Sequence, residues 1–310
     1  MGKRCELWQD RFPSADGRSS IAYYCFVPVD QAPKAVIQIS HGMCEYFLRY
    51  RPLAEYLCEL GYAVCGNDHS GHGESAADES ELGLTGGASA MVEDLYTLTE
   101  KLREQFVGIP LVLLGHSMGS FLARLYAETY SDGADGLVIV GTGGPDNPTA
   151  MGKALAKTVM KLRGKGHRSG LITGIAFGSY NKGFDCEKGK KAWLTRDTAV
   201  VDAYAEDKFC NYTFTAKGYY DLFDMIGRVS RREWAEKLPK ALPTLILSGE
   251  ADPVGAYGKG VRKVHERMIA AGMSDVSLIL YPEMRHEVFN ELGKEQVWGD
   301  LALWLSTHGF

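Results

Sequence analysis

Short runs of apolar residues recur along most of the chain, separated by segments in which apolar residues repeat with helical spacing. Buried strands are predicted at 35–39, 62–65, 111–114, 137–140, 244–247 and 276–281, and a hairpin at 5–12 and 20–27. Helical spacing follows the first buried strand at Leu53, Leu57 and Leu60. Strands that alternate with helices predict an α/β fold, with a mostly parallel central sheet covered by helices on both faces.

This alternation stops between about residues 143 and 239. The segment has no clear buried-strand run, and aromatic residues such as Trp193, Tyr204 and Tyr219 supply much of its apolar content. It is too long for a connecting loop. We therefore expect a core of residues 1–143 and 240–310, interrupted by a helical cap at 144–239. The residues that bind substrate are expected in this cap, but the sequence does not single them out.

The run 111–114 leads directly into Gly115-His116-Ser117-Met118-Gly119, and a helical pattern follows. A strand, a sharp turn and a helix in this order form the nucleophile elbow, which holds a serine hydroxyl clear of its own backbone. Gly115 and Gly119 are required where strand and helix come so close that a Cβ atom would collide, and the serine is expected to adopt an unfavourable backbone angle. The sequence therefore predicts Ser117 as a nucleophile.

A nucleophilic serine needs a base and an acid, which follow it in the order acid and then histidine in this kind of sheet. Among the histidines after the elbow, only His286 comes shortly after a predicted strand. Asp252 follows the strand 244–247 and precedes a proline, so it is the preferred acid, with Glu250 as the near competitor and Asp146 as the distant one.

The oxyanion hole is expected to use the backbone N–H of Met118 and one from the loop after the strand 35–39, which points to Met43. In that loop, His41 and Glu45 are expected to brace the backbone. His69 and His72 have a spacing that suggests a metal site, but they lack a convincing carboxylate or cysteine partner, so neither a metal nor an organic cofactor is predicted.

Several motifs taken together resemble the monoacylglycerol lipase and lysophospholipase (S33-like) branch of the α/β-hydrolases. They are His41-Gly42, the stretch from Asp68 to Ser75, the elbow, Asp252 and His286. The resemblance implies a cap-covered serine hydrolase that cleaves the ester of a lipid with one acyl chain, with Ser117, Asp252 and His286 as the catalytic triad and Met43 and Met118 as amide donors. Cys44 and Tyr46 depart from the family pattern, which usually has glycine and histidine there.

Composition limits the other possibilities. The 310 residues are 45% hydrophobic and 24% charged, as in an ordinary globular protein, and a net charge of -5 gives no reason to expect a nucleic-acid partner. Seven scattered cysteines show neither zinc-site spacing nor a secreted disulfide framework, and no signal peptide or membrane span is recognisable. These features favour a reducing cytoplasm. The oligomeric state is not predicted.

The early cap is basic, because no acidic residue lies between Asp146 and Asp185 while seven lysines and arginines do. Apolar residues repeat near helical spacing at Met151, Leu155, Val159 and Leu162. Two interpretations stay open: a lid that contacts an anionic membrane surface, and a solvated helix that packs its apolar stripe on the core.

The predicted reaction is hydrolysis of a lipid ester through an acyl-enzyme. The first rival is a carboxylesterase or thioesterase for short soluble acyl compounds, and the second is a catalytically silent binding module of the same fold. A Pro-directed peptidase is disfavoured because the loop after the strand 35–39 lacks a His-Gly-Gly-Pro-Gly type of sequence.

Overall fold

The computed structural model describes residues 5–29, 31–146, 149–185 and 191–310. Eight strands form one sheet in the order β1-β2-β4-β3-β5-β6-β7-β8. They are β1 (Cys5–Pro13), β2 (Ser20–Pro28), β3 (Val36–Ser40), β4 (Ala63–Asn67), β5 (Leu111–His116), β6 (Gly136–Val140), β7 (Thr244–Gly249) and β8 (Val276–Tyr281). β1 and β2 run antiparallel to each other, β2 runs antiparallel to β4, and all other pairs are parallel. Each strand expected from the apolar runs is confirmed.

The core helices separate into two groups that cover the two faces of the sheet. Apolar residues of α1 (Arg51–Glu59) and α10 (Lys294–Thr307) belong to one buried cluster, and those of α3 (Met118–Thr129) and α9 (Lys259–Ala270) belong to another. α2 (Ala88–Gln105) contributes to the second cluster and to a third one beside it. This arrangement is an α/β fold with a mostly parallel sheet covered by helices on both faces, as the alternation of strands and helices predicted.

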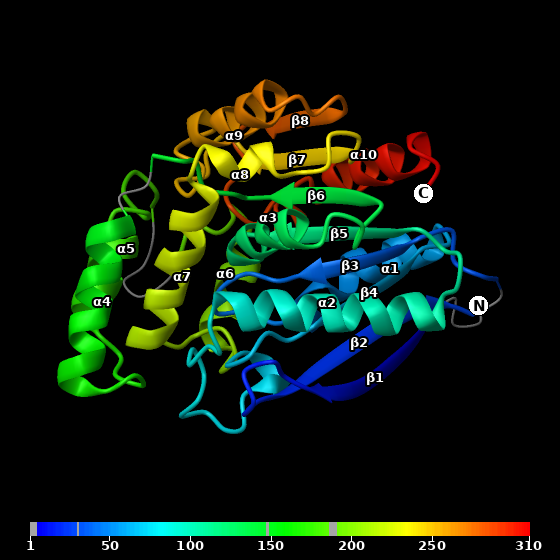
Figure 1. Ribbon diagram of the computed structural model, residues 1–310. Helices are drawn as coiled ribbons and strands as arrows, with labels where there is room; N and C mark the ends of the chain where they lie inside the picture. The colour runs from blue at the N-terminus through cyan, green and yellow to red at the C-terminus, as the bar shows by residue number, and fades with distance from the viewer. Residues whose placement is uncertain (1–4, 30, 147–148, 186–190) are drawn as a thin grey trace.

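Among the described residues, the helices between β6 and β7 are those of the predicted cap. They are α4 (Thr149–Arg163), α5 (Gly170–Phe177), α6 (Thr198–Glu206), α7 (Ala216–Val229) and α8 (Glu233–Glu236). Figure 1 shows α4, α5 and α7 gathered beyond the end of the sheet at which the parallel strands terminate. Ligands of open α/β sheets bind at that end. The cap boundaries at 143/144 and 239/240 remain predictions.

Short 3-10 turns complete the core at η1 (Phe47–Tyr50), η2 (Gly73–Ser75) and η3 (Val288–Asn290). η1 and η3 follow the ends of β3 and β8 at some distance along the chain, and both flank loops that carry predicted site residues. Within the described residues, no helix has the length and apolar character needed to cross a membrane.

The described cysteines form one disulfide, which the sequence did not predict, and no multiple-disulfide framework. Cys5 of β1 and Cys58 of α1 are joined by a disulfide across 53 residues, whereas Cys25, Cys44, Cys65 and Cys210 are free and buried. Cys186 lies outside the described residues. Sequence spacing could not reveal the pair because it depends on where α1 packs. A reducing cytoplasm as the location therefore stays a prediction.

Candidate active site

The turn between β5 and α3 has the geometry of a nucleophile elbow. Ser117 has φ +54°, which a non-glycine residue rarely adopts, and its amide donates to the Val140 carbonyl at 2.9 Å. A Cβ atom on Gly115 would collide with the backbone of Gly119, and one on Gly119 would collide with the backbone of Ser40. The two glycines are therefore needed for close packing, as the sequence predicted.

Asp252 and His286 meet at the carboxyl end of the sheet. Nδ1 of His286 lies 2.9 Å from Oδ2 of Asp252, and both side chains are buried. The other oxygen of Asp252 accepts the Val254 amide at 2.8 Å, so the carboxylate is fixed from two sides. The competitors do not reach the histidine: Glu250 pairs with Arg262 and Asp146 with Lys263, all at exposed positions.

Gly42, Met43 and Met118 line the same pocket as Ser117 and His286. A Cβ atom on Gly42 would lie only 3.0 Å from Cβ of Ser117, so the backbone of this loop passes directly beside the serine. Cys44 has φ +55°, a value that glycine adopts without strain, where the resembled family has its second glycine. The structure thus brings together every predicted site residue at the end of β3, β5, β7 and β8.

A buried ionic network connects the loop after β3, the elbow and the histidine loop. The guanidinium of Arg49 binds Glu287 through two hydrogen bonds of 2.8 and 2.9 Å and binds Glu45 at 2.9 Å. Glu45 also accepts from Tyr50 and from the Gly42 amide. Gly42 and Glu45 lie on either side of Met43, the predicted oxyanion donor. The network therefore fixes this loop, which is the role expected for Glu45.

His116 is the second cation of this network. Its Nδ1 lies 2.9 Å from a Glu45 oxygen and its Nε2 lies 3.4 Å from the carbonyl of His286. Both partners only accept hydrogen bonds, so this arrangement favours the protonated ring, in which both nitrogens donate. Burial by itself would lower the pKa of His116, but the Glu45 carboxylate outweighs burial and raises this pKa. Burial likewise opposes ionisation of Glu45, yet His116 and Arg49 hold its pKa below the usual range.

Three further histidines brace the loop after β4. His41 Nε2 accepts the amide of His69 at 2.9 Å, and the His69 ring lies 3.0 Å from the Ser40 hydroxyl. His72 packs against His41 and against the cap residue Phe214. Burial lowers the pKa of His41 to about 4 and that of His72 to about 3, so these rings are neutral near pH 7. Among the described residues, no group of three histidine, cysteine, aspartate or glutamate side chains is placed to hold a metal.

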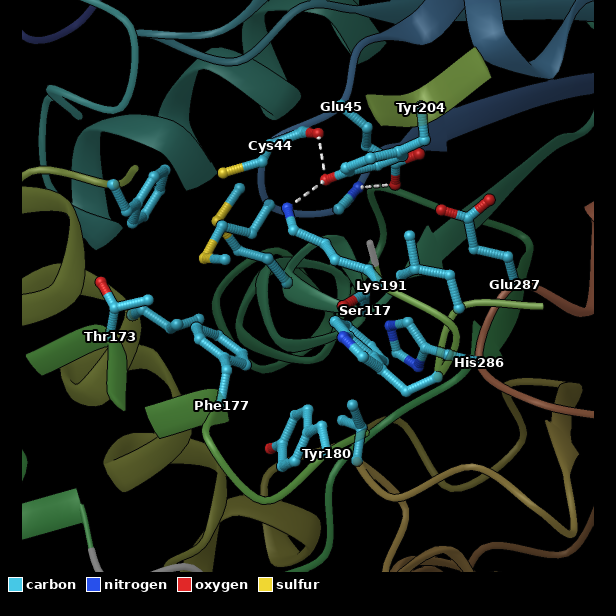
Figure 2. A pocket seen from close by; sticks show the side chains of 18 of the residues that line it. Cys44, Glu45, Ser117, Thr173, Phe177, Tyr180, Lys191, Tyr204, His286 and Glu287 are labelled. Atoms are coloured by element: carbon cyan, nitrogen blue, oxygen red, sulfur yellow. Dashed lines mark hydrogen bonds between the residues drawn. The ribbon is translucent and has the colours of Figure 1, made fainter. Parts of the chain in front are cut away.

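A cavity of about 310 Å³ lies in front of Ser117, between the sheet edge and the cap. Its apolar lining includes five side chains from α3, α5 and α7: Phe121, Phe177, Tyr219, Leu222 and Ile226. Its polar lining includes Cys44, Glu45, Lys191, Tyr204 and Glu287. Figure 2 shows Thr173, Phe177 and Tyr180 on the side of the cavity away from Cys44, Lys191 and Tyr204.

The cap directly contacts the loops that carry the predicted site residues. The amides of His286 and Glu287 donate to the carbonyls of Trp193 and Leu194, at 3.3 and 2.7 Å. The Trp193 ring lies 5.0 Å from the ring of His286. The Tyr204 hydroxyl donates to the Cys44 carbonyl at 2.7 Å. The sequence named the whole cap as the source of binding residues but could not select these, because contacts between segments this distant leave no local pattern. The Glu45–Arg49 pair had a signal in its four-residue spacing.

Comparison with known proteins agrees with this geometry. A model of the S33 serine aminopeptidase family matches residues 31–293. The chain belongs to this family of α/β-hydrolases. The S33-family protein is 28% identical to the monoacylglycerol lipase of Mycolicibacterium smegmatis over 94% of this chain and 95% of that one. It is also 28% identical to human monoglyceride lipase, over 88% of this chain and 83% of the human protein.

Among solved structures, a thermostable carboxyl esterase from Bacillus coagulans in complex with glycerol superposes with a TM-score of 0.90. The two proteins are 29% identical, and the match covers 98% of this chain and 99% of the esterase. The S33-family protein is therefore a carboxylic ester hydrolase, with a lipase or esterase role.

Proposed function

We propose that this protein hydrolyses the ester of a lipid with a single acyl chain, a monoacylglycerol or a lysophospholipid. The observation that carries the proposal is the cavity in front of Ser117, which is apolar at Phe177, Leu222 and Ile226 and charged at Glu45, Lys191 and Glu287. An acyl chain gains by leaving water on the apolar side, which places the ester carbonyl at the serine and the alcohol half on the polar side. The names of the two lipase relatives support the same substrate class.

The proposed mechanism is acyl transfer in two steps. Oγ of Ser117 attacks the ester carbonyl while Nε2 of His286 takes the hydroxyl proton, and Asp252 stabilises the resulting imidazolium. The amides of Met43 and Met118 are proposed to bind the oxyanion. The alcohol leaves with the proton from His286, and water then hydrolyses the acyl-enzyme with His286 again as base.

Labelling with a fluorophosphonate probe tests this proposal. Wild-type protein is expected to label and Ser117→Ala is not. A series of glycerol esters and p-nitrophenyl esters then measures acyl-chain preference. A preference for acetyl over medium and long chains would overturn the lipid proposal in favour of a short-chain esterase. A folded wild type that does not label would favour the binding module.

We also propose that the outer face of α4 and α5 makes transient contact with a membrane surface. Four apolar side chains there are largely exposed, with exposed fractions of 62–80%: Met151, Leu162, Leu171 and Ile175. Basic residues lie among them at Lys157, Lys161, Arg163 and Lys165, all exposed. Apolar side chains that enter the lipid interface, with lysines and arginines around them, are the usual elements of such a contact.

A further inference from the structure

Lys191 occupies the polar side of the active-site cavity. It is the one lysine or arginine among the described residues that line this cavity. Its ammonium lies 3.3 Å from the Tyr204 hydroxyl and 4.5 Å from the centre of the same ring. Figure 2 shows the side chain passing above Ser117 toward Tyr204 and Cys44.

The other charges at this end of the cavity balance one another. Glu45 and Glu287 are paired with Arg49 and with the ring of His116, whose protonated form Glu45 favours, so each carboxylate has a cationic partner of its own. None of the contacts of the described residues gives Lys191 a carboxylate partner. Its ammonium is therefore an excess positive charge in a partly enclosed site, where an unpaired charge is costly and an anion is favoured.

The position of this charge determines which half of a substrate it meets. With the acyl chain against Phe177 and the side chains of α7, and with the ester carbonyl at Ser117, the alcohol half extends toward Tyr204 and Lys191. A lysine ammonium is a compact point charge that suits phosphate oxygens. A neutral glycerol carries no negative charge and therefore cannot form an ion pair with this ammonium.

We propose that Lys191 determines substrate specificity by binding an anionic phosphate on the alcohol half, so that lysophospholipids with a glycerophosphate head group are preferred over neutral monoacylglycerols. This inference rests on the proposed lipid-ester hydrolysis and chooses between its two substrate classes. Tyr204 is a positioning residue in this arrangement, because it holds the ammonium and donates its own proton to the Cys44 carbonyl.

The test compares 1-decanoylglycerol with 1-decanoylglycerol 3-phosphate, both as monomers, so that the substrates differ only in the phosphate. A hydrogen-bonded charge pair contributes about 1.5–3 kcal/mol, or roughly tenfold to a hundredfold in affinity. The wild type is expected to have the higher kcat/KM for the phosphate ester. Lys191→Met is expected to reduce the ratio of the two kcat/KM values by at least about tenfold, and Lys191→Arg is expected to restore most of it.

Lys182→Met is the matched control, because Lys182 is an exposed cap lysine that does not line the cavity. It is expected to leave the ratio unchanged. Tyr204→Phe is expected to lower both activities equally, because it loosens the Cys44 loop. If Lys191→Met also lowers both activities equally, Lys191 only positions that loop and the proposal is overturned. A higher kcat/KM for the neutral ester in the wild type would also overturn it. If the wild type labels with the fluorophosphonate but cleaves neither lipid, the lipid function itself fails and the inference fails with it.

Discussion

Asp252 and Glu250 lie two residues apart in one turn, yet their side chains enter opposite environments. Asp252 is buried against His286, whereas the Glu250 side chain is 43% exposed and pairs with Arg262 at 3.4 Å. A carboxylate that accepts the Nδ1 proton keeps the imidazole in the tautomer that can act as a base at Nε2. The two carboxylates therefore differ in position: only Asp252 contacts the histidine ring.

Asp252→Asn is expected to lower kcat on a p-nitrophenyl ester by about a thousandfold to ten-thousandfold with little change in KM, because the tautomer is lost while the cavity stays. Glu250→Gln is the matched control and is expected to stay within about twofold. Steady-state kinetics on both variants, with circular dichroism to verify folding, provides the measurement. Equal losses in the two variants would assign no special role to Asp252.

The elements of the core could be predicted from the sequence because each has its own local signal. The buried strands are short apolar runs. The elbow is a short sequence motif whose glycines are required by the close approach of the strand and the helix that it joins. For the cap helix α4, the apolar pattern did not predict correctly which side chains are buried. Of its predicted stripe, Leu155 and Val159 pack inward, but Met151 and Leu162 are 80% and 74% exposed.

The reason is that α4 packs on α7 through its smallest residues. Gly152 and Ala156 are buried, and a Cβ atom on Gly152 would meet the ring of Phe223 at 2.8 Å. Small side chains let two helices approach closely, and a hydrophobicity pattern gives them little weight. The interpretation of α4 as a helix that buries its whole apolar stripe is therefore wrong. Lys153 and Arg168 have partners within the protein, so the basic surface is smaller than the sequence suggests.

The exposed face of α4 and α5 supports a prediction about lipid surfaces. The double variant Leu162→Ser with Leu171→Ser is expected to lower binding to anionic vesicles by at least about tenfold, since each leucine contributes about 1.5–3 kcal/mol when it leaves water. Co-sedimentation with vesicles of phosphatidylcholine and phosphatidylserine measures this. Turnover of a monomeric ester is expected to stay within about twofold.

The matched control is Val107→Ser with Leu303→Ser. It removes two apolar side chains that are exposed on the surface of the molecule outside the cap. It is expected to bind vesicles as the wild type does. If both double variants lose binding equally, general surface hydrophobicity accounts for the association and the proposed contact through α4 and α5 is wrong.

At the scale of the whole molecule, contacts between distant segments hold the cap against the core. Arg196 of the cap binds Glu291 of the core, 95 residues away, and Tyr204 of the cap donates to a core carbonyl 160 residues away. The sequence contained every residue of these contacts, but their partners follow only from the packing of the sheet. The predicted triad could be placed from the order of strands and loops along the chain, whereas substrate-binding side chains could not be selected, because they depend on how the cap packs.

The histidine cluster between core and cap links overall stability to pH. The pKa of His72 is lowered by burial to about 3, against about 6.5 in an unfolded chain. Below pH 6.5 the unfolded state binds a proton at His72 that the folded state does not, so stability falls as the pH decreases. Burial raises the pKa of Asp68 to about 6, which acts in the opposite direction, so the effect of His72 must be measured as a difference between variants.

His72→Gln is therefore expected to reduce the pH dependence of the unfolding free energy. Between pH 7 and pH 5 the wild type is expected to lose about 2 kcal/mol more than the variant, because 1.5 pH units of linked protonation are removed. Urea unfolding at both pH values measures the difference, and it stays interpretable even if the variant is less stable at both. His265→Gln, in α9 outside the cluster, controls for the loss of any histidine. Parallel pH profiles for wild type and His72→Gln would show that the buried ring is not what makes the fold sensitive to acid.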